Sequence, residues 1–266
     1  MFRTSLCLLM LTLLPAAASA TPWQEHAGIA SLFAQSGARG TFVVATPDGT
    51  LLGHDAERAH TRFVPASSFK IANALIGLAR GTVRDLDEVL PYGGQPQPFP
   101  QWERDMSLRE AFPISNVPVF QELARRTGAS TYRKDLARLE YGNGAVGERV
   151  DRFWLDGPLA ISAVEQLRFL ERLAMGTLPY PPGAQRSARV LARMESGKGW
   201  ALYGKTGWQN APDPGVGWWV GWVECGHRVF PFALNLDIRS TADAALRLEL
   251  GRASLQAAGV LPCRLP

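Results

Sequence analysis

Lysine is scarce in this chain, and its placement points to the residues that could carry chemistry. Lysine and arginine together number 28, and only four of these are lysine: Lys70, Lys134, Lys198 and Lys205. A buried lysine amine can lose its proton and act as a base or a nucleophile, whereas an arginine guanidinium stays charged. Lys70 and Lys205 stand close to hydroxyl-bearing residues, so these two are the first candidates for a catalytic amine.

The first candidate lies in the segment Ser67-Ser68-Phe69-Lys70. Residues three apart at the start of a helix share a face, so we expect the Ser67 hydroxyl and the Lys70 amine to be neighbours. Lys70 is the only charged residue between Arg62 and Arg80, and burial there would lower its pKa. A neutral amine can activate an adjacent serine, and the Ser67 N–H could help to stabilise an oxyanion. The alternative is a lysine that extends from a surface helix to water, which the surrounding apolar residues argue against.

Two further segments could complete such a site. Lys205-Thr206-Gly207 ends a predicted strand, where glycine permits close approach of a substrate while Lys205 and Thr206 offer a cation and a hydroxyl to a carboxylate. The alternative is a strand-end turn with a solvated lysine. Ser115-Asn116-Val117 supplies another serine, in the loop before a helix that Pro118 opens. A lone serine there is otherwise a helix cap or a turn residue.

Hydrophobic patterns place strands at both ends of the chain and helices in its middle. We therefore expect an α+β fold, in which the two chain ends share one antiparallel sheet flanked by helices and the helical middle forms a second lobe. The expected strands are 41–45, a return strand from 51, 200–205, 217–224 and 229–237. The expected helices are 69–80, 118–127, 131–140, one that a capping box at Ser162 begins and Gly176 ends, 184–195 and 241–258, with a loop at 91–100.

The composition excludes several classes of function. Of the 266 residues, 46% are apolar and 20% are charged, which is typical of a globular protein with a large core. The net charge of +4 is scattered, so a nucleic-acid partner is not expected. Four histidines without an H-E-x-x-H pair argue against a metal site. Nucleotide-binding loops and the G-x-S-x-G motif do not occur in the sequence.

The first 20 residues resemble a secretory signal. Arg3 precedes the short apolar run 6–14, and Ala18-Ser19-Ala20 is typical of a cleavage site. We therefore expect export to the periplasm, with residues 21–266 as one catalytic domain and no membrane segment after cleavage. Cys225 and Cys263 remain in that domain, and the sequence leaves open whether they form a disulfide.

The order Ser67/Lys70, Ser115, Lys205-Thr206-Gly207 is the signature of penicillin-recognising serine enzymes. Within them, the sequence resembles the class D, oxacillinase-type β-lactamases over the mature chain. The resemblance implies the β-lactamase/D,D-peptidase-like fold. Besides the three segments above, the matching motifs are Tyr141-Gly142-Asn143, Phe153-Trp154-Leu155-Asp156-Gly157, 161–170, 217–224 and 232–237; Asp156 stands where many members have glutamate.

The resemblance also implies roles for individual residues. Ser67 would be the acylated nucleophile, and Lys70, carrying a carbamate formed with CO₂ or bicarbonate, would be the general base. Trp154, Val117 and Leu155 would support the carbamate, and Ser115 and Lys205 would relay a proton. The N–H groups of Ser67 and Trp208 would form an oxyanion hole, and the substrate-binding residues would be Thr206, Gly207, Arg247 and Trp102. Tyr141 and Asn143 would be site-lining or structural residues. Arg239 is the rival of Arg247 for the substrate carboxylate.

The activity so implied is hydrolysis of β-lactam antibiotics such as penicillins and oxacillin-like compounds, which would confer resistance. No bound metal or cofactor is expected, and the expected partner is a small-molecule β-lactam, with a homodimer as a possible assembly. The alternatives are a penicillin-binding sensor domain or a D,D-peptidase that is acylated without efficient turnover. The sequence does not decide which β-lactams are preferred, whether carbapenems are hydrolysed, or the oligomeric state.

Overall fold

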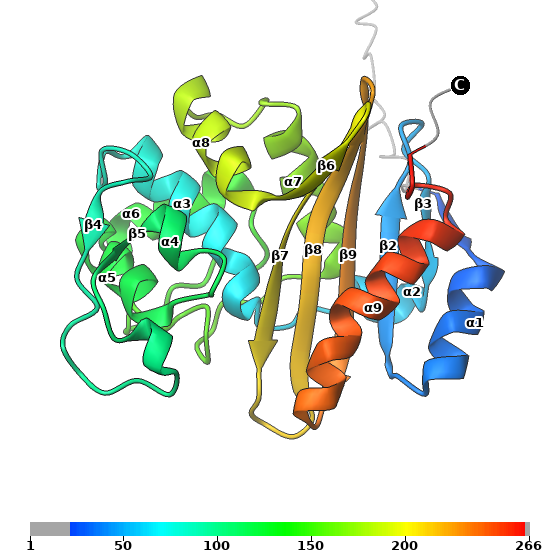
Figure 1. Cartoon of the computed structure of the whole chain (residues 1–266), viewed down its shortest axis with the longest axis horizontal. Coiled ribbons are helices and arrows are strands. Elements are labelled where there is room, and N and C mark those ends of the chain that lie inside the picture. The colour runs from blue at the N-terminus through cyan, green and yellow to red at the C-terminus, as the bar shows by residue number, and fades with distance from the viewer. Residues whose placement is uncertain (1–21, 264–266) are drawn as a thin grey trace, which may run out of the picture.

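A computed structural model describes residues 22–263, built around a seven-stranded sheet (Figure 1). The predicted signal, residues 1–20, lies outside the described residues. The strand order is β1-β3-β2-β9-β8-β7-β6. The strands are β1 (Trp23–Glu25), β2 (Gly40–Ala45), β3 (Leu51–His54), β6 (Arg193–Gly197), β7 (Trp200–Gln209), β8 (Gly215–Cys225) and β9 (Arg228–Ile238), while β4 (Val89–Leu90) and β5 (Met106–Ser107) form a separate pair.

The two ends of the chain meet in the middle of the sheet. Strand β2 pairs antiparallel with β9, so that Phe42 lies opposite Leu234. The predicted α+β fold, with one sheet built from both ends, is confirmed. One edge differs from the expected antiparallel sheet, because β1 pairs parallel with β3 and Trp23 lies opposite Leu51. A parallel neighbour requires a crossover, which here passes through a helix and β2.

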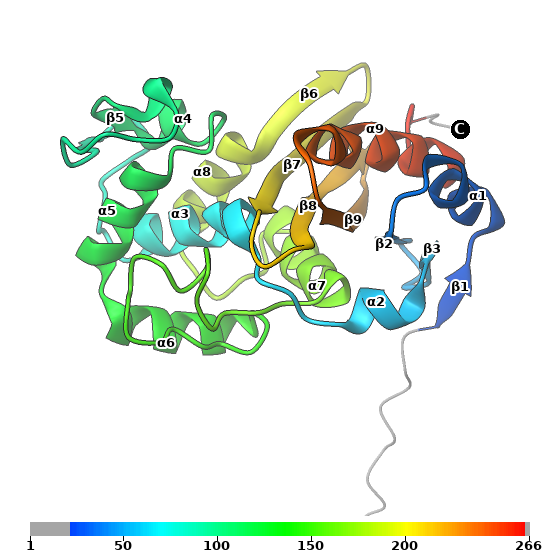
Figure 2. The same cartoon turned by 90° about the horizontal axis from the view of Figure 1, so that it is seen from below.

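Helices cover both faces of the sheet. In Figures 1 and 2, α1 and α9 lie against one face, and α7 lies on the other face together with the helical lobe. The helices are α1 (Ala27–Ser36), α2 (Ala56–His60), α3 (Lys70–Ala79), α4 (Leu108–Ala111), α5 (Val117–Thr127), α6 (Ala129–Leu139), α7 (Ala163–Ala174), α8 (Pro182–Ala192) and α9 (Thr241–Ala257), with 3₁₀ turns η1 (Ala66–Phe69) and η2 (Pro100–Trp102).

Two apolar cores result, one on each face of the sheet. Successive residues of β8 point to opposite faces, so Trp218 and Val220 enter the larger core beneath the helical lobe, while Trp219 enters the smaller core beneath α1 and α9. Burial on both faces explains why β8 is apolar along nearly its whole length rather than alternating.

The helix ends follow local signals where the sequence carries them. The Ser162 hydroxyl accepts from the Glu165 N–H at 3.2 Å, and the Glu165 carboxylate accepts from the Ser162 N–H at 2.9 Å, which confirms the capping box. Gly176, just after α7, has φ +69°, a conformation that other residues adopt only with strain. Among residues 22–263, none of the helices combines the length and the apolar composition that crossing a bilayer would require.

The predicted helix 184–195 is wrong at its carboxyl end. Helix α8 stops at Ala192, and 193–197 form the edge strand β6, with Arg193 opposite Tyr203 and Gly197 opposite Trp200. The helical pattern of residue types is overridden because pairing with β7 satisfies the backbone groups of this segment. The short elements β1, α1, α2, β4, β5 and α4 were also not expected from the sequence.

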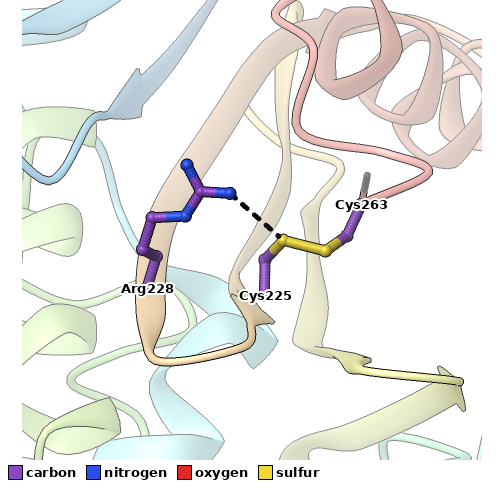
Figure 3. Close-up of a disulfide and its surroundings, with 3 residues drawn as sticks. All are labelled: Cys225, Arg228 and Cys263. Carbon is purple, nitrogen blue, oxygen red and sulfur yellow. Dashed lines mark hydrogen bonds between the residues drawn. A yellow bond between two sulfur atoms is a disulfide. The ribbon is translucent and has the colours of Figure 1, made fainter. Parts of the chain in front are cut away.

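A disulfide joins the end of the chain to the sheet. Cys225 ends β8 and is bonded to Cys263, with their Cα atoms 5.8 Å apart (Figure 3). The Arg228 guanidinium lies 3.8 Å from the Cys225 sulfur. The bond links the turn between β8 and β9 to the segment that follows α9, which closes the smaller core at this end. It answers the question that the sequence left open.

Candidate active site

A cleft of about 250 Å³ opens between the sheet and the helical lobe. The lobe contributes the turn η1, the segment around η2, and the loop between α4 and α5 with the first residue of α5, and the sheet side contributes β7 and α9. None of the described residues that line it is acidic. The lining residues are Ser67, Phe99, Gln101, Trp102, Ile114, Ser115, Val117, Leu155, Thr206, Gly207, Trp208 and Arg247.

Ser67 and Lys70 are adjacent, as their spacing predicts. Ser67 lies in the 3₁₀ turn η1, and Lys70 is the first residue of α3. The Lys70 Nζ donates to the Ser67 Oγ at 2.8 Å. The backbone of Ala66 has φ +48°, a sparsely populated conformation that the surrounding contacts must maintain. The hydroxyl therefore sits beside an amine at the floor of the cleft.

The electrostatics of Lys70 follow from its burial. The side chain is 0% exposed, and its amine lies 5.3 Å from the centre of the Phe120 ring. Burial, and to a smaller extent the charge of Lys205, lowers the pKa of Lys70 well below its usual value of 10.5. A lysine with such a pKa holds a free lone pair, so it can accept a proton or react with an electrophile.

A second lysine faces the first across the cleft floor. Lys205 in β7 is 4% exposed, and its amine donates to the Ser115 hydroxyl and, at 3.2 Å, to the Thr206 carbonyl. Burial, with a smaller contribution from Arg247, lowers the pKa of Lys205 to about 7. At neutral pH this amine can therefore either hold or release a proton.

Ser115 is not the cap of α5, which was the alternative interpretation of this serine. Asn116 fills that position, because its side-chain oxygen accepts from the Val119 N–H at 3.0 Å. Ser115 itself adopts φ +55° and directs its hydroxyl to Lys205. A strained backbone at a residue that does not cap the helix indicates a local conformation held for the hydroxyl.

Arg247, and not Arg239, lies in the wall of the cleft. The Arg247 guanidinium donates to the Gly207 carbonyl at 2.5 Å and to the Ala244 carbonyl at 2.6 Å, and it lies 6.0 Å from the centre of the Trp208 indole ring. Burial lowers the pKa of Arg247 to about 10, so it stays charged at neutral pH. Arg239 is exposed and is not among the lining residues.

Gly207 allows β7 to touch the turn that carries Ser67. A Cβ atom at this position would lie 2.8 Å from the Pro65 carbonyl oxygen and 3.0 Å from the Ser68 nitrogen. Contacts this short with backbone atoms are not compatible with a side chain, so glycine is required. Because β7 and the turn approach so closely, Trp208 and Ser67 line the same cleft.

Trp102 and Trp154 lie at different depths relative to the cleft. Trp102 is held at the rim, where its indole N–H donates to the Ile114 carbonyl at 3.0 Å. Trp154 is fully buried behind Phe69, with 5.5 Å between ring centres. The Trp154 indole N–H has no hydrogen-bond partner among the described residues. Such a buried donor usually has a partner, so this one is available to a group that joins the site.

Tyr141 and Asn143, expected as lining or structural residues, are not among the residues that line the cleft. Tyr141 packs behind Phe69, with ring centres 5.5 Å apart. Asn143 is exposed, and its side chain fixes the following loop by donating to the Pro158 carbonyl at 2.7 Å and accepting from the Ala160 N–H at 3.0 Å. The two residues support the site from outside it.

A buried polar network beside Ser67 was missed from the sequence. The Gln166 amide donates to the Ser68 hydroxyl at 3.0 Å, and the Ser68 hydroxyl donates to the Pro65 carbonyl at 2.7 Å. The Tyr141 hydroxyl lies 3.4 Å from the Gln166 side-chain oxygen. A signal existed, because Gln166 occupies a position on the apolar face of its helix, between Ala163 and Leu170, where a polar residue needs a buried partner.

Within residues 22–263, no group of three or more His, Cys, Asp or Glu side chains is arranged to hold a metal ion.

Comparisons of the sequence and of the structure with known proteins point to the same family. Residues 40–256 match the penicillin binding protein transpeptidase domain. The chain is 37% identical to β-lactamase OXA-5 of Pseudomonas aeruginosa, over 86% of this chain and 87% of that protein, and 35% identical to β-lactamase OXA-48 of Klebsiella pneumoniae, over 92% and 93%. The crystal structure of FUS-1 (OXA-85), a class D β-lactamase from Fusobacterium nucleatum subsp. polymorphum, is similar at a TM-score of 0.86 and 36% identity, covering 90% of this chain and all of that one.

The lowered pKa of Lys205 predicts a pH-dependent stability. Between its folded pKa of about 7 and its usual value of 10.5, the unfolded chain binds more protons than the folded one, so the free energy of unfolding rises with pH. Lys205→Met should remove about 2 kcal/mol of the rise between pH 7 and pH 9. The measurement is urea unfolding at both pH values, in buffer depleted of CO₂ so that Lys70 stays an amine.

Lys134→Met serves as the control, because Lys134 is exposed in α6 and should leave the pH slope unchanged. Equal slopes for the wild type and Lys205→Met would show that Lys205 titrates normally.

Proposed function

The chain belongs to the class D β-lactamase family, and from that premise we propose that it hydrolyses β-lactams through an acyl-enzyme on Ser67. The single observation that carries this proposal is the buried Lys70 amine 2.8 Å from the Ser67 hydroxyl, in a cleft with no acidic residue among its described lining. A base of this kind makes a serine nucleophilic without histidine.

Acylation needs a base and an anion-binding site. The Ser67 oxygen attacks the lactam carbonyl carbon, its proton passes to the base at Lys70, and the carbonyl oxygen gains the negative charge. We assign the oxyanion hole to the N–H groups of Ser67 and Trp208, because Gly207 holds β7 against the turn that contains Ser67. Each preorganised donor of this kind is worth roughly 10²–10³ in rate.

Ring opening then needs a proton on the departing nitrogen. The carbon–nitrogen bond of the lactam breaks, the ester to Ser67 forms, and the nitrogen accepts a proton from the Ser115 hydroxyl. Lys205 replaces that proton through its hydrogen bond to Ser115, and its pKa of about 7 suits an acid that works at neutral pH.

The substrate carboxylate is assigned to Thr206 and Arg247. Both line the cleft, and the Arg247 guanidinium keeps its charge at neutral pH. Trp102 at the rim and Leu155 on the wall offer apolar contact to the remainder of the substrate. The base at Lys70 would pass the proton it took from Ser67 to Lys205, which had given one up. It could then activate a water molecule that releases the ring-opened acid and restores Ser67.

The surroundings of Lys70 fit a carbamate on its amine. Only a neutral amine reacts with CO₂, and burial keeps the pKa of Lys70 low. When present, the carbamate supplies an anionic general base for both acylation and deacylation. The Trp154 indole N–H, which has no partner among the described residues, is the donor that would hold it, and Val117 and Leu155 exclude water from its side of the cleft.

The proposed activity is tested with a chromogenic cephalosporin. We expect many turnovers per enzyme molecule, and a mass increase on Ser67 equal to one ring-opened substrate in rapidly quenched samples. Ser67→Ala should lose both signals, while Ser36→Ala, in the exposed end of α1, should keep them. A stoichiometric burst with no later turnover would instead favour a penicillin-binding sensor or a slowly deacylating D,D-peptidase.

The carbamate is tested at Trp154. Trp154→Phe removes the donor and keeps an aromatic ring, so carbamate retention should fall and added bicarbonate should restore activity at least tenfold, a part of the roughly 10²–10⁴-fold that a general base contributes. The wild type should respond more weakly, because its carbamate is better held. Activities that are independent of bicarbonate in both proteins, or a ¹³C spectrum without a carbamate signal, would contradict the carbamate.

We also propose that the chain is exported and works in the periplasm. The signal-like residues 1–20 support this, and so does the Cys225–Cys263 disulfide, because such bonds persist in oxidising compartments. We expect protein recovered from the periplasmic fraction to begin at Thr21 and to show two thiols only after reduction. Retention of Met1, or two free thiols in the untreated protein, would argue against export.

A further inference from the structure

A second hollow of about 360 Å³ adjoins the proposed acylation cleft on its β6 side. Thr206 lines both hollows. Lys205 lines the second hollow, while its amine is bonded to Ser115 in the first. The two hollows, together called the groove below, are therefore neighbours, and the Lys205–Ser115 contact lies at their boundary.

Three elements build the walls of both hollows from consecutive residues. The loop before α5 gives Phe112 and Pro113 to the second hollow and Ile114 and Ser115 to the first. Strand β7 lines the second hollow with Gly204, Lys205 and Thr206, and it lines the first hollow with Thr206, Gly207 and Trp208. Helix α9 lines the second hollow with Leu248 and the first hollow with Arg247. A molecule in the first hollow that reaches past the Lys205–Ser115 contact meets the same three elements in the second.

The edge of β7 runs along this groove. Strand β6 pairs with β7 only as far as Tyr203, which lies opposite Arg193. Within the described residues, no strand pairs with that edge of β7 from Gly204 to Gln209, where it passes both hollows. This edge of β7 is therefore free of strand pairing from Gly204, next to the residue that faces the start of β6, to the residues that line the first hollow.

Exposed apolar side chains gather along the groove. Phe99, Ile114 and Trp208 are exposed large apolar residues that line the first hollow. Met194, 41% exposed, and Leu248, 37% exposed, line the second. Apolar side chains that cluster in a hollow while staying open to water are typical of a ligand-binding surface.

We propose that the second hollow is a subsite for an uncharged, apolar substituent on the ring carbon next to the carboxylate-bearing carbon of a β-lactam. The proposal rests on the proposed function. In a cephalosporin those two carbons are bonded to each other. With the carboxylate held by Thr206 and Arg247, the proposed orientation of the ring runs the neighbouring substituent along β7 toward Met194 and Leu248, which line the second hollow.

The charges around the groove select against a cation in this subsite. Arg193 is exposed and lines the second hollow, and Lys205 and Arg247 flank the passage between the hollows. None of the described residues that line the second hollow is acidic. A positively charged substituent would meet like charges there, whereas a neutral aromatic or aliphatic group gains apolar contact.

The test uses three cephalosporins that share one acyl side chain and differ in this substituent: a methyl group, a benzylthiomethyl group and a pyridiniummethyl group. For the wild type, kcat/KM should be about threefold to tenfold higher for the benzylthiomethyl compound than for the methyl compound, mainly through KM. The pyridinium compound should lack this advantage.

Met194→Asp should bring the benzylthiomethyl-to-methyl ratio close to one, because it places a charge against the apolar substituent. Met175→Asp is the matched control: Met175 is exposed at the end of α7, and its substitution should leave the ratio unchanged. A wild-type ratio near one, or equal changes of the ratio in both variants, would overturn the subsite while the methyl compound is still hydrolysed. If no compound is turned over, the proposed function fails and the subsite fails with it.

Discussion

The burial of the Lys70 amine beside the Ser67 hydroxyl is the constraint on which the rest of the site depends. The amine is fully buried, and its first contact is the serine oxygen rather than a carboxylate. A lysine in such a place favours its neutral form, which is the form that can take a proton. Phe120 and the aromatic group around Phe69 exclude water on the lobe side, so the helical lobe sets the chemistry of this amine.

Positioning Ser67 requires both lobes at once. The turn η1 holds a strained residue, Ala66, and the contact with Gly207 of β7 presses on the turn from the sheet side. From the lobe side, Gln166 reaches the same turn through Ser68. Because contacts from two directions define the turn, the serine can keep a conformation that a free loop would relax.

The site gathers basic groups at some expense to folding. Lys70, Lys205 and Arg247 all have lowered pKa values because burial disfavours their charged forms, and no acidic residue appears among the causes of these shifts. At neutral pH Arg247 stays charged and Lys205 is partly charged, and their field favours an anionic ligand in the cleft. The stability that offsets this arrangement comes from elsewhere: two apolar cores, the Cys225–Cys263 disulfide, and partly buried ion pairs such as that of Arg58 with Asp237 at 2.8 Å.

The sequence by itself determined the parts of this protein that depend on local spacing. The adjacency of Ser67 and Lys70 follows from helical geometry, the start of α7 follows from its capping box, and the α+β class follows from strand patterns at the two chain ends. The resemblance to class D β-lactamases rested on ordered motifs, and it indicated the family before any geometry was known.

Tertiary structure decided what depends on contacts between distant segments. Only the fold shows that 193–197 form a strand rather than the end of a helix, because a neighbouring edge supplies its hydrogen bonds. Only the fold places Arg247 in the cleft wall and Arg239 outside it, joins Cys225 to Cys263, and moves Asn143 out of the site. Local spacing fixes which side chains share one turn or one face, whereas packing across the sheet and between the lobes fixes which distant side chains meet.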